Sequence, residues 1–431
     1  MKKYSVLFLT AIFLVHLLSG CSVNPVSGKK EFTLLSVEKE IEMGKESYPV
    51  MTQMNNGEYI SNGLKTYVNN IGQRLASVSH RKDVPYEFNV VNSSDINAYA
   101  LPGGKISITR GMLSVIETEG QLAAVLGHEI GHVTARHASQ AITRDMLLQT
   151  ALTVGQVAMD VKDVKNRQYY AMAGNVAASL VGLKYSRNQE SQSDELGLTY
   201  MISAGYNPEE FIKMLEILRG SQQREPYRIE ALIQSHPLTR DRVAYAEDWV
   251  KRSRHENPGM DSMVKNTDEF EKWIKPLRDE REAYAHYDAA EELVNKEAYS
   301  AAVEEYQKSI QLKRNEALFH ADLGWVYHKL DRKDMAESEY DKAIYYNPNL
   351  FKARYGAGDL FIDKGNYQRA ITELRAAEGM LPNIPAVYYL QGKAYEKLNL
   401  TYKAQEAYQK TLELDPEGEY GQASRQRLDS M

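Results

Sequence analysis

Two histidines and a glutamate stand at a spacing that suits a metal-dependent hydrolase. Residues 128–132 read His-Glu-Ile-Gly-His within an apolar segment. Residues four apart on a helix share one face, so His128 and His132 can bind one Zn²⁺ while Glu129 faces the water that the metal activates. The pattern predicts a zinc hydrolase. The competing interpretation is a core helix with two hydrogen-bonded histidines.

The residues around this motif carry the signals of a helix. Thr118 followed three residues later by Gln121 resembles a capping box, which marks a helix start. An apolar stripe at helical spacing accompanies the motif and consists of Leu122, Leu126, Ile130 and Val133. We therefore expect one buried helix to carry both histidines and the glutamate.

A catalytic zinc needs a third protein ligand and an open position for water. Glu190 and Asp194 lie four residues apart downstream of the motif. Glu190 can supply the third ligand from a second helix, and Asp194 can accept the free ring N–H of a ligand histidine and orient it. Alone, such an acidic pair would usually be a solvated helix face.

Taken together, these motifs resemble peptidase family M48, the gluzincin metallopeptidases. The resemblance rests on the run from His128 to His137, on Glu190 and Asp194, on Ser-His-Pro at 235–237 and on Arg242. The segments 97–104 and 24–28 are similar to the family's approach to its active-site strand and to its lipoprotein members. The resemblance implies an α+β fold, in which a mainly helical zincin-type domain contains a small sheet. It also implies one zinc per chain on His128, His132 and Glu190. Ser193 stands where the family more often has alanine, which leaves both acidic side chains in place.

Loop residues after the second helix complete the expected site. His236, stiffened by the following proline, could donate to the oxyanion of the reaction. The family resemblance makes a second role credible, in which His236 takes the fourth zinc position as a latch. A structural histidine is the plain alternative. Arg242 could act as the donor or hold the loop. His137 would lie about 140° from the metal face if the helix continued, so we do not expect it to be a ligand.

A strand is expected just before the helix. Residues 105–109 alternate polar and apolar after two glycines, which predicts a strand with one buried face. In metallopeptidases of this type such a strand lies beside the zinc and pairs with extended substrate. We therefore expect a substrate-binding role for Lys105, Ile106, Ser107 and Ile108, with an ordinary interior strand as the alternative.

The chain begins with a targeting signal. Two lysines precede an apolar stretch at 6–18, and Cys21 follows Leu-Ser-Gly, as in a bacterial lipobox. We expect residues 1–20 to be a lipoprotein signal peptide and Cys21 to be lipidated; an ordinary secretory signal is the alternative. Cys21 is the only cysteine, so the mature protein would form no internal disulfide. Ser22 resembles the residue that directs such lipoproteins to the outer membrane.

The C-terminal third is a repeat array with a period of 34 residues. Glycine, alanine and proline recur at this step, at Gly324, Gly358 and Gly392, at Ala336, Ala370 and Ala404, and at Pro348, Pro382 and Pro416. This is the tetratricopeptide pattern of helix pairs that stack into an all-α solenoid. We expect four units at 283–316, 317–350, 351–384 and 385–418, a capping helix at 419–431, a linker at 251–282 and a peptidase-like domain at 21–250. The array would bind a protein segment on its concave face or act as a rigid spacer.

Composition fits a globular body on a tether. Charged residues are 26% and hydrophobic residues 43%, and removing the two lysines of the signal changes the formal charge from −6 to −8. No basic patch indicates nucleic-acid binding. Two apolar stretches within 150–184 are too short to span a bilayer and could form a helical hairpin that covers the site or touches lipid.

These features predict a lipid-anchored zinc endopeptidase with C-terminal repeats. The pairing of the two domains resembles the bacterial β-barrel assembly-enhancing protease group. That resemblance implies action in the periplasm on unfolded or misassembled outer-membrane proteins, at the outer membrane, with the β-barrel assembly machinery as a candidate partner of the repeats. The main alternative is a non-enzymatic periplasmic chaperone or assembly scaffold with a structural zinc. A cell-wall amidase would use similar ligands but gives no reason for the repeats.

Overall fold

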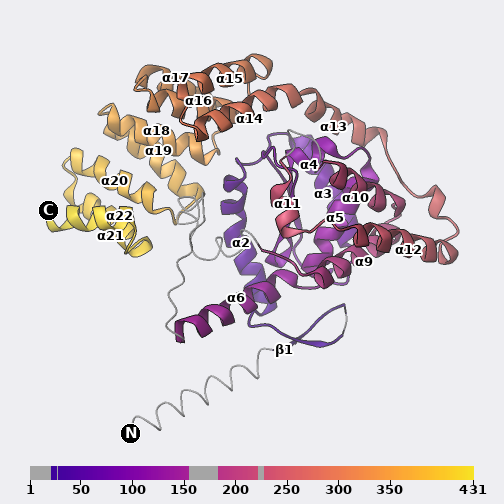
Figure 1. Ribbon diagram of the computed structural model, residues 1–431. Coiled ribbons are helices and arrows are strands. Elements are labelled where there is room, and N and C mark those ends of the chain that lie inside the picture. Colours follow the sequence, from indigo (N-terminus) through magenta and orange to yellow (C-terminus); the bar gives the residue numbers. More distant parts are fainter. Residues whose placement is uncertain (1–20, 27, 155–182, 222–227) are drawn as a thin grey trace, which may run out of the picture.

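The computed structural model describes residues 21–26, 28–154, 183–221 and 228–431 (Figure 1). The predicted signal peptide at 1–20 and most of the apolar segment at 150–184 lie outside these residues. The described chain consists of a mainly helical part with a small sheet, followed by an arc of paired helices. The expected α+β fold followed by an all-α solenoid is confirmed.

The sheet that borders the candidate site has three strands in the order β3-β5-β4. Strand β5 (Lys105–Thr109) pairs parallel with β3 (Glu87–Val91) and antiparallel with β4 (Ala98–Leu101). The strand at 105–109 was expected, but it lies in the centre of the sheet. Because both its edges are already paired, Lys105, Ile106, Ser107 and Ile108 cannot pair with a substrate. Among the described strands, β4 forms the edge of the sheet on this side of β5.

Both faces of β5 are buried, although alternation predicted one buried face. Ile106 and Ser107, which point to opposite faces, are each 0% exposed. Helix α2 (Val37–Met54) covers the face of Ser107, where the Tyr48 hydroxyl donates to the Ile106 carbonyl at 3.2 Å. Helices α3 (Asn62–Ala76) and α5 (Glu119–Thr134) cover the other face within the main core. A short polar side chain is buried here because α2 supplies a second layer.

Helix α5 carries the His-Glu-Ile-Gly-His motif and begins as expected. The Thr118 side chain accepts from the Gln121 N–H at 3.2 Å, and the Gln121 side chain accepts from the Glu117 N–H at 2.7 Å. The Gln121 side chain thus reaches one residue further back than in a standard capping box. Every residue of α5 is buried, which explains why its sequence is almost entirely apolar apart from the motif.

Glycines allow α5 to lie very close to α9 (Arg187–Ser203). A Cβ atom added at Gly131 would lie 2.9 Å from the Ser193 carbonyl oxygen. Gly127 faces Gly197 in the same way. Because these backbones nearly touch, the acidic residues of α9 reach the histidines of α5.

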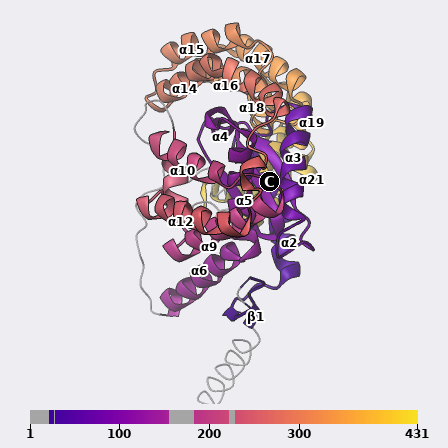
Figure 2. The same ribbon diagram turned by 90° about the vertical axis from the view of Figure 1, so that its right-hand side faces the viewer.

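The remaining elements enclose these two helices. The described residues start with a hairpin of β1 (Cys21–Val23) and β2 (Lys30–Phe32), which lies with α6 at the end of the molecule opposite α15 and α17 (Figure 2). None of the described helices is long and apolar enough to cross a membrane. The other elements before the repeats are α4 (Arg110–Val115), α6 (His137–Val154), α10 (Glu209–Ser221), α11 (Glu230–Ser235), α12 (Arg240–Glu256), η1 (Pro102–Gly104), η2 (Met260–Ser262) and α13 (Asp268–Asp279).

Each predicted repeat unit contains one pair of helices. The small residues at the 34-residue step lie where the helices cross; a Cβ added at Gly392 would lie 2.6 Å from the Tyr408 ring. The predicted linker at 251–282 is itself largely helical, since it contains the end of α12, η2 and α13. Helix α13 runs directly into α14, the first repeat helix. The repeat helices are α14 (Arg281–Asn295), α15 (Tyr299–Leu312), α16 (Ala317–Lys329), α17 (Lys333–Tyr346), α18 (Phe351–Asp363), α19 (Tyr367–Met380), α20 (Pro385–Lys397), α21 (Thr401–Leu414) and the terminal α22 (Glu419–Asp429).

The repeat arc packs directly on the first part of the chain. The Arg110 guanidinium lies 3.3 Å from the ring centre of Tyr284 on α14. Glu280, between α13 and α14, accepts from the Tyr59 hydroxyl at 2.8 Å and pairs with Lys313 at 2.5 Å. The arrangement is that of a docked domain, in which the first repeat shares polar contacts with the sheet-containing part.

Candidate metal centre

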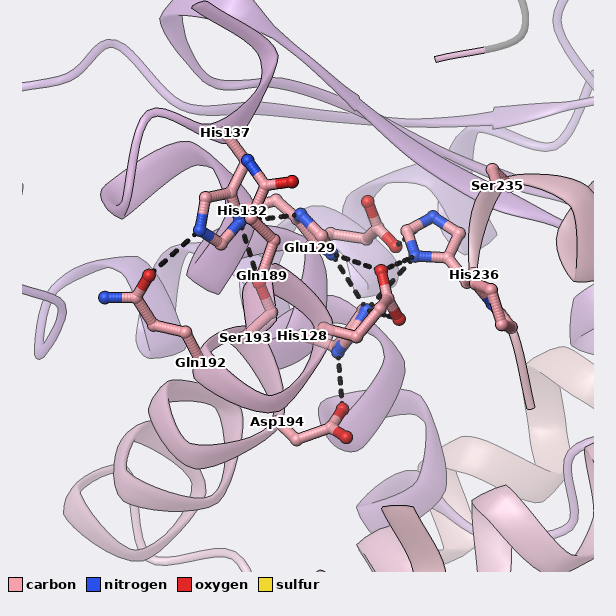
Figure 3. A network of polar contacts seen from close by, with 12 residues as sticks. His128, Glu129, His132, His137, Gln189, Gln192, Ser193, Asp194, Ser235 and His236 are labelled. Carbon is pink, nitrogen blue, oxygen red and sulfur yellow. Dashed lines mark hydrogen bonds and ion pairs between the residues drawn. The ribbon is translucent and has the colours of Figure 1, made fainter. Parts of the chain in front are cut away.

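Four buried side chains from three elements converge on one point. His128 and His132 come from α5, Glu190 from α9, and His236 from the loop after α11 (Figure 3). Their potential ligand atoms all lie within 4.8 Å of one another. The four side chains make six pairs, and in five of these pairs the ring nitrogens or carboxylate oxygens that face each other are 2.9, 3.1, 3.3, 3.3 and 3.6 Å apart. Ligands of a tetrahedral zinc, with bonds of about 2.0–2.1 Å, are separated by about 3.3 Å. The cluster therefore has the dimensions of a zinc site.

The charges in this buried region also fit a dication. Three carboxylates, Glu129, Glu190 and Asp194, are at most 3% exposed and face one guanidinium, that of Arg242. Glu129 Oε2 is buried and accepts no hydrogen bond within the described residues. Buried carboxylates require a counter-charge. A Zn²⁺ ion together with Arg242 would balance the three carboxylates.

Burial shifts the pKa values of the side chains in this cluster. It lowers the pKa of His132 well below its ordinary value, which leaves a neutral ring with a lone pair for a metal. It raises the pKa of Glu129, so that this carboxylate holds a proton more readily than an exposed one. Burial also opposes ionisation of Asp194, but the Arg242 guanidinium outweighs it and lowers the pKa of that carboxyl. Asp194 therefore stays charged while Glu129 is poised to accept a proton.

Asp194 and Arg242 form one unit behind the ligands. Asp194 Oδ1 lies 2.9 Å from His128 Nδ1, the position from which a carboxylate orients a ligand histidine. Arg242 donates to both oxygens of Asp194 at 2.6 and 2.7 Å, and its Nη1 lies 2.7 Å from Glu190 Oε2. Nη1 also donates to the Pro237 carbonyl at 3.3 Å. Of the two roles expected for Arg242, the geometry favours holding the loop and the acidic residues.

His236 lies among the ligands rather than opposite them. Its Nδ1 is 2.9 Å from Glu190 Oε1 and 3.3 Å from His128 Nε2. Its Nε2 is 3.9 Å from Glu129 Oε1. A zinc ion held by the other three side chains would therefore have His236 beside it where a catalytic site needs an open position for water. Of the two active roles expected for this residue, the geometry matches the latch.

Two further residues touch the site and were not predicted to do so. His137 Nδ1 lies 3.0 Å from His132 Nδ1, because α5 ends at Thr134 and the chain turns back. The angle expected for a continuing helix therefore does not apply. The ring of Tyr185 lies 3.9 Å from that of His132, centre to centre. The Arg-His pair that ends the family motif was a usable signal for His137, whereas nothing in the sequence singled out Tyr185.

Within the described residues, strand β4 pairs with no strand on its outer edge, which lies beside the ligands. The Thr109 N–H donates to the Asn97 carbonyl at 3.0 Å. In an antiparallel pair, every second residue of β4 hydrogen-bonds to β5, and the main-chain groups of the residues between them point away from β5. By this pattern, the main chains of Ala98 and Ala100 point away from β5. Ala98 lines a small pocket with His128 and Glu129. One step upstream, the outward N–H of Ile96 donates to the Arg228 carbonyl at 2.7 Å.

Comparison with known proteins agrees with this geometry. Residues 63–250 match peptidase family M48, and residues 319–350 and 385–417 match a tetratricopeptide repeat. The beta-barrel assembly-enhancing protease of Escherichia coli K12 is 28% identical over 234 residues, which cover 53% of this chain and 47% of that protein. The mitochondrial metalloendopeptidase OMA1 of Schizosaccharomyces pombe is 26% identical over 236 residues, covering 53% and 66%.

Among solved structures, a MamA fragment from Desulfovibrio magneticus RS-1 aligns with a TM-score of 0.32 and 24% identity, over 34% of this chain and 81% of that one. The chain spans about half the length of the curated bacterial relatives that it matches. Both the site and the sequence matches thus lead to the same family. By this match and by the geometry of the cluster, residues 63–250 form a metallopeptidase domain similar to peptidase family M48, and tetratricopeptide repeats follow it.

Proposed function

We propose that the protein is a zinc-dependent endopeptidase that cleaves unfolded or misassembled proteins. The observation that carries this proposal is the placement of Glu129 beside the cluster of His128, His132 and Glu190. The three ligands would hold one ion per chain. A structural metal site has no use for an adjacent carboxylate with a buried, unpaired oxygen, whereas hydrolysis needs such a group.

The chain's own residues account for the proton transfers of peptide hydrolysis. A bound zinc ion would supply Lewis acidity that lowers the pKa of water and polarises the scissile carbonyl. Glu129 takes a proton from the attacking water and delivers it to the leaving amine, which its raised pKa favours. Asp194 and Arg242 keep His128 and Glu190 in place throughout, since Asp194 lies 2.9 Å from His128 Nδ1 and Arg242 forms a buried ion pair with Glu190.

Strand β4 supports an extended substrate. Main-chain groups of Ala98 and Ala100 would pair with a peptide laid along this edge, in the manner of β-strand addition. Such pairing gives affinity with little dependence on side chains. It also requires a segment that is already extended, which an unfolded protein offers and a compact domain does not.

Outer-membrane proteins in the periplasm are the substrates that we propose. The support is the name of the bacterial relatives, which are described as beta-barrel assembly-enhancing proteases. Tetratricopeptide repeats commonly bind protein segments on their concave face. The repeats would therefore recruit the substrate or the β-barrel assembly machinery.

A lipidated Cys21 would attach the protein to the outer membrane. In the β1–β2 hairpin, Cys21 lies opposite Phe32. Phe32 and Leu34 are apolar and are 36% and 42% exposed. Next to a lipid anchor, both side chains could enter the membrane interface. Mass spectrometry of the mature N-terminal peptide, and membrane fractionation of a Cys21→Ser variant, test this step; a soluble wild type would exclude it.

A scaffold with a structural zinc is the second candidate. The observation that favours it is the fourth protein ligand, His236, because structural zinc sites are closed. In that case the repeats alone would carry the activity. Glu129 would then be dispensable.

Cleavage by residues 22–431 distinguishes the two candidates. Casein and an unfolded outer-membrane protein serve as substrates for the wild type, for His236→Ala, and for each combined with Glu129→Gln. We expect Glu129→Gln to abolish cleavage in both backgrounds while one zinc per chain remains. If no form cleaves and zinc stays bound, the scaffold is favoured.

A further inference from the structure

We propose that His137 is a positioning residue for the zinc ligand His132, acting through a chain of two hydrogen bonds that ends on Gln192. His137 Nδ1 lies 3.0 Å from His132 Nδ1, and His137 Nε2 lies 3.0 Å from Gln192 Oε1 (Figure 3). His132 and His137 are 1% and 0% exposed. The proposal rests on the proposed zinc site, because it concerns which nitrogen of His132 faces the ion.

The donor or acceptor role of each atom determines which ring nitrogen of His132 and of His137 carries the proton. His132 Nε2 points into the ligand cluster, 3.1 Å from His128 Nε2 and 3.3 Å from Glu190 Oε1. If Nε2 gives its lone pair to a metal, the ring proton must lie on Nδ1, which then donates to His137 Nδ1. His137 must therefore carry its own proton on Nε2, where the Gln192 carbonyl oxygen accepts it. Each bond has one donor and one acceptor in this arrangement alone.

A break in the backbone brings His137 to this position. Arg136 adopts φ 60°, in the left-handed region that a non-glycine residue rarely enters. It is held there by Glu40, whose Oε1 lies 2.5 Å from Arg136 Nε, and by the Leu35 carbonyl at 2.7 Å. Buried polar contacts offset the cost of this conformation. The break reverses the chain so that His137 starts α6 against the ring of His132.

The two ligand histidines are thus oriented by different chemistry. His128 faces the carboxylate of Asp194 at 2.9 Å, which adds negative charge. His132 faces a neutral imidazole, which adds none. Because three carboxylates already balance Arg242 and a dication, a fourth would leave one charge unpaired. A neutral hydrogen-bond acceptor beside His132 keeps the charges balanced. Ser193 Oγ, 3.3 Å from His137 Nδ1, supplies a second polar contact to the same ring.

Zinc affinity of the full chain, measured by competition with a chromogenic chelator, tests the proposal without relying on catalysis. His137→Leu removes the acceptor for His132 and should weaken zinc binding about 10–100-fold, the usual effect of losing a partner of a metal ligand. His137→Asn places an oxygen where Nδ1 lies and should retain affinity within about threefold of wild type. In the Co²⁺-loaded protein, the visible spectrum should change for His137→Leu and stay close to wild type for His137→Asn.

Gln192→Met keeps the test valid if His137→Leu does not fold, since Gln192 is only partly buried. It should weaken zinc binding by a smaller, several-fold factor. Its matched control is Thr199→Val, on the same helix, whose hydroxyl donates to the Glu195 carbonyl and whose loss should leave zinc affinity unchanged.

Two results would overturn the proposal. Equal losses for His137→Leu and His137→Asn would make the role one of packing, and unchanged affinity in His137→Leu and Gln192→Met would remove it altogether. Wild-type protein that binds one zinc but cleaves nothing would instead count against the proposed peptidase and leave this inference intact.

Discussion

His236 Nδ1 lies 2.9 Å from Oε1 of Glu190, so a loop histidine and the third ligand share one face of the cluster. The two residues are 46 positions apart in the sequence. Glu190 is held from behind by Arg242, whereas His236 is carried by a short segment between α11 and α12. Because Arg242 binds the carboxylates of α9 at 2.6–2.7 Å but reaches the loop only through the Pro237 carbonyl at 3.3 Å, we expect His236 to be the residue that leaves while the other three ligands stay in place.

Removal of this histidine should activate the enzyme. In His236→Ala, three protein ligands remain and the fourth position becomes available to water, so kcat/KM for unfolded casein should rise at least about tenfold. Zinc affinity should fall at the same time, because one ligand is lost. Replacement of the exposed His255 by alanine serves as the control. Loss of cleavage with zinc retained would instead make His236 a donor to the transition state.

A methyl group between α5 and α9 should weaken the metal site. In Gly131→Ala the new Cβ would lie 2.9 Å from the Ser193 carbonyl, which is backbone and cannot yield cheaply. The helices must separate, which moves Glu190 away from the histidines and costs about 1–3 kcal/mol in overpacking. Equilibrium urea unfolding and zinc titration measure both effects.

Gly220→Ala is the matched control for that substitution. Gly220 also lies in a helix, but its added Cβ meets no atom of the described residues within 4 Å. The protein should be unchanged or slightly more stable, because alanine is the better helix former. Comparable losses in the two variants would show that helix geometry, not close packing, is responsible.

Loss of the Arg242 guanidinium should destabilise the fold more than any surface ion pair. Arg242→Met leaves Asp194 and Glu190 buried without their counter-charge, and breaking such a pair typically costs about 3–5 kcal/mol. Saturating zinc should recover part of this loss, since the ion supplies positive charge at the same place. Urea unfolding with chelator and with zinc gives the two values. Arg252→Met, which breaks an exposed pair with Asp248, should cost less than about 1 kcal/mol.

The contact between the repeats and the peptidase domain should contribute to the stability of both. Glu280→Ala removes the acceptor for Tyr59 and the partner of Lys313, and should cost about 1–3 kcal/mol. Differential scanning calorimetry should show a single transition at lower temperature. Glu282→Ala, two residues away and exposed, is the control. Two separate transitions in the wild type would contradict a docked arrangement.

Much of the architecture could be predicted because it depends on local signals. The capping pair Thr118 and Gln121, the glycine-led strand at 105–109 and the 34-residue step of the repeats each specify an element by short-range chemistry. The spacing of His128 and His132 likewise needs only helix geometry. These features are visible in a single sequence, and the structure has them at the expected residues.

The remainder depends on how elements pair in space. Strand order is set by tertiary packing, so nothing within residues 105–109 indicated that β5 would be central and β4 the edge. The second layer formed by α2 made both faces of β5 buried. The contact between His137 and His132 follows from the left-handed Arg136, which in turn depends on Glu40 about a hundred residues earlier. Sequence periodicity contains no information on such distant partners.

The segment that carries His236 also reaches the substrate edge. The Arg228 carbonyl accepts from the outward N–H of Ile96 at 2.7 Å, just upstream of β4, while His236 sits among the ligands. A substrate chain that continued along β4 past Ala98 and also reached the ligand cluster would have to displace the segment at both ends, and a short peptide could not do both. The protease should therefore discriminate by substrate length. Peptides of increasing length and constant cleavage site should show an abrupt rise in kcat/KM, which His236→Ala would abolish; a gradual trend, identical in both proteins, would exclude this form of selection.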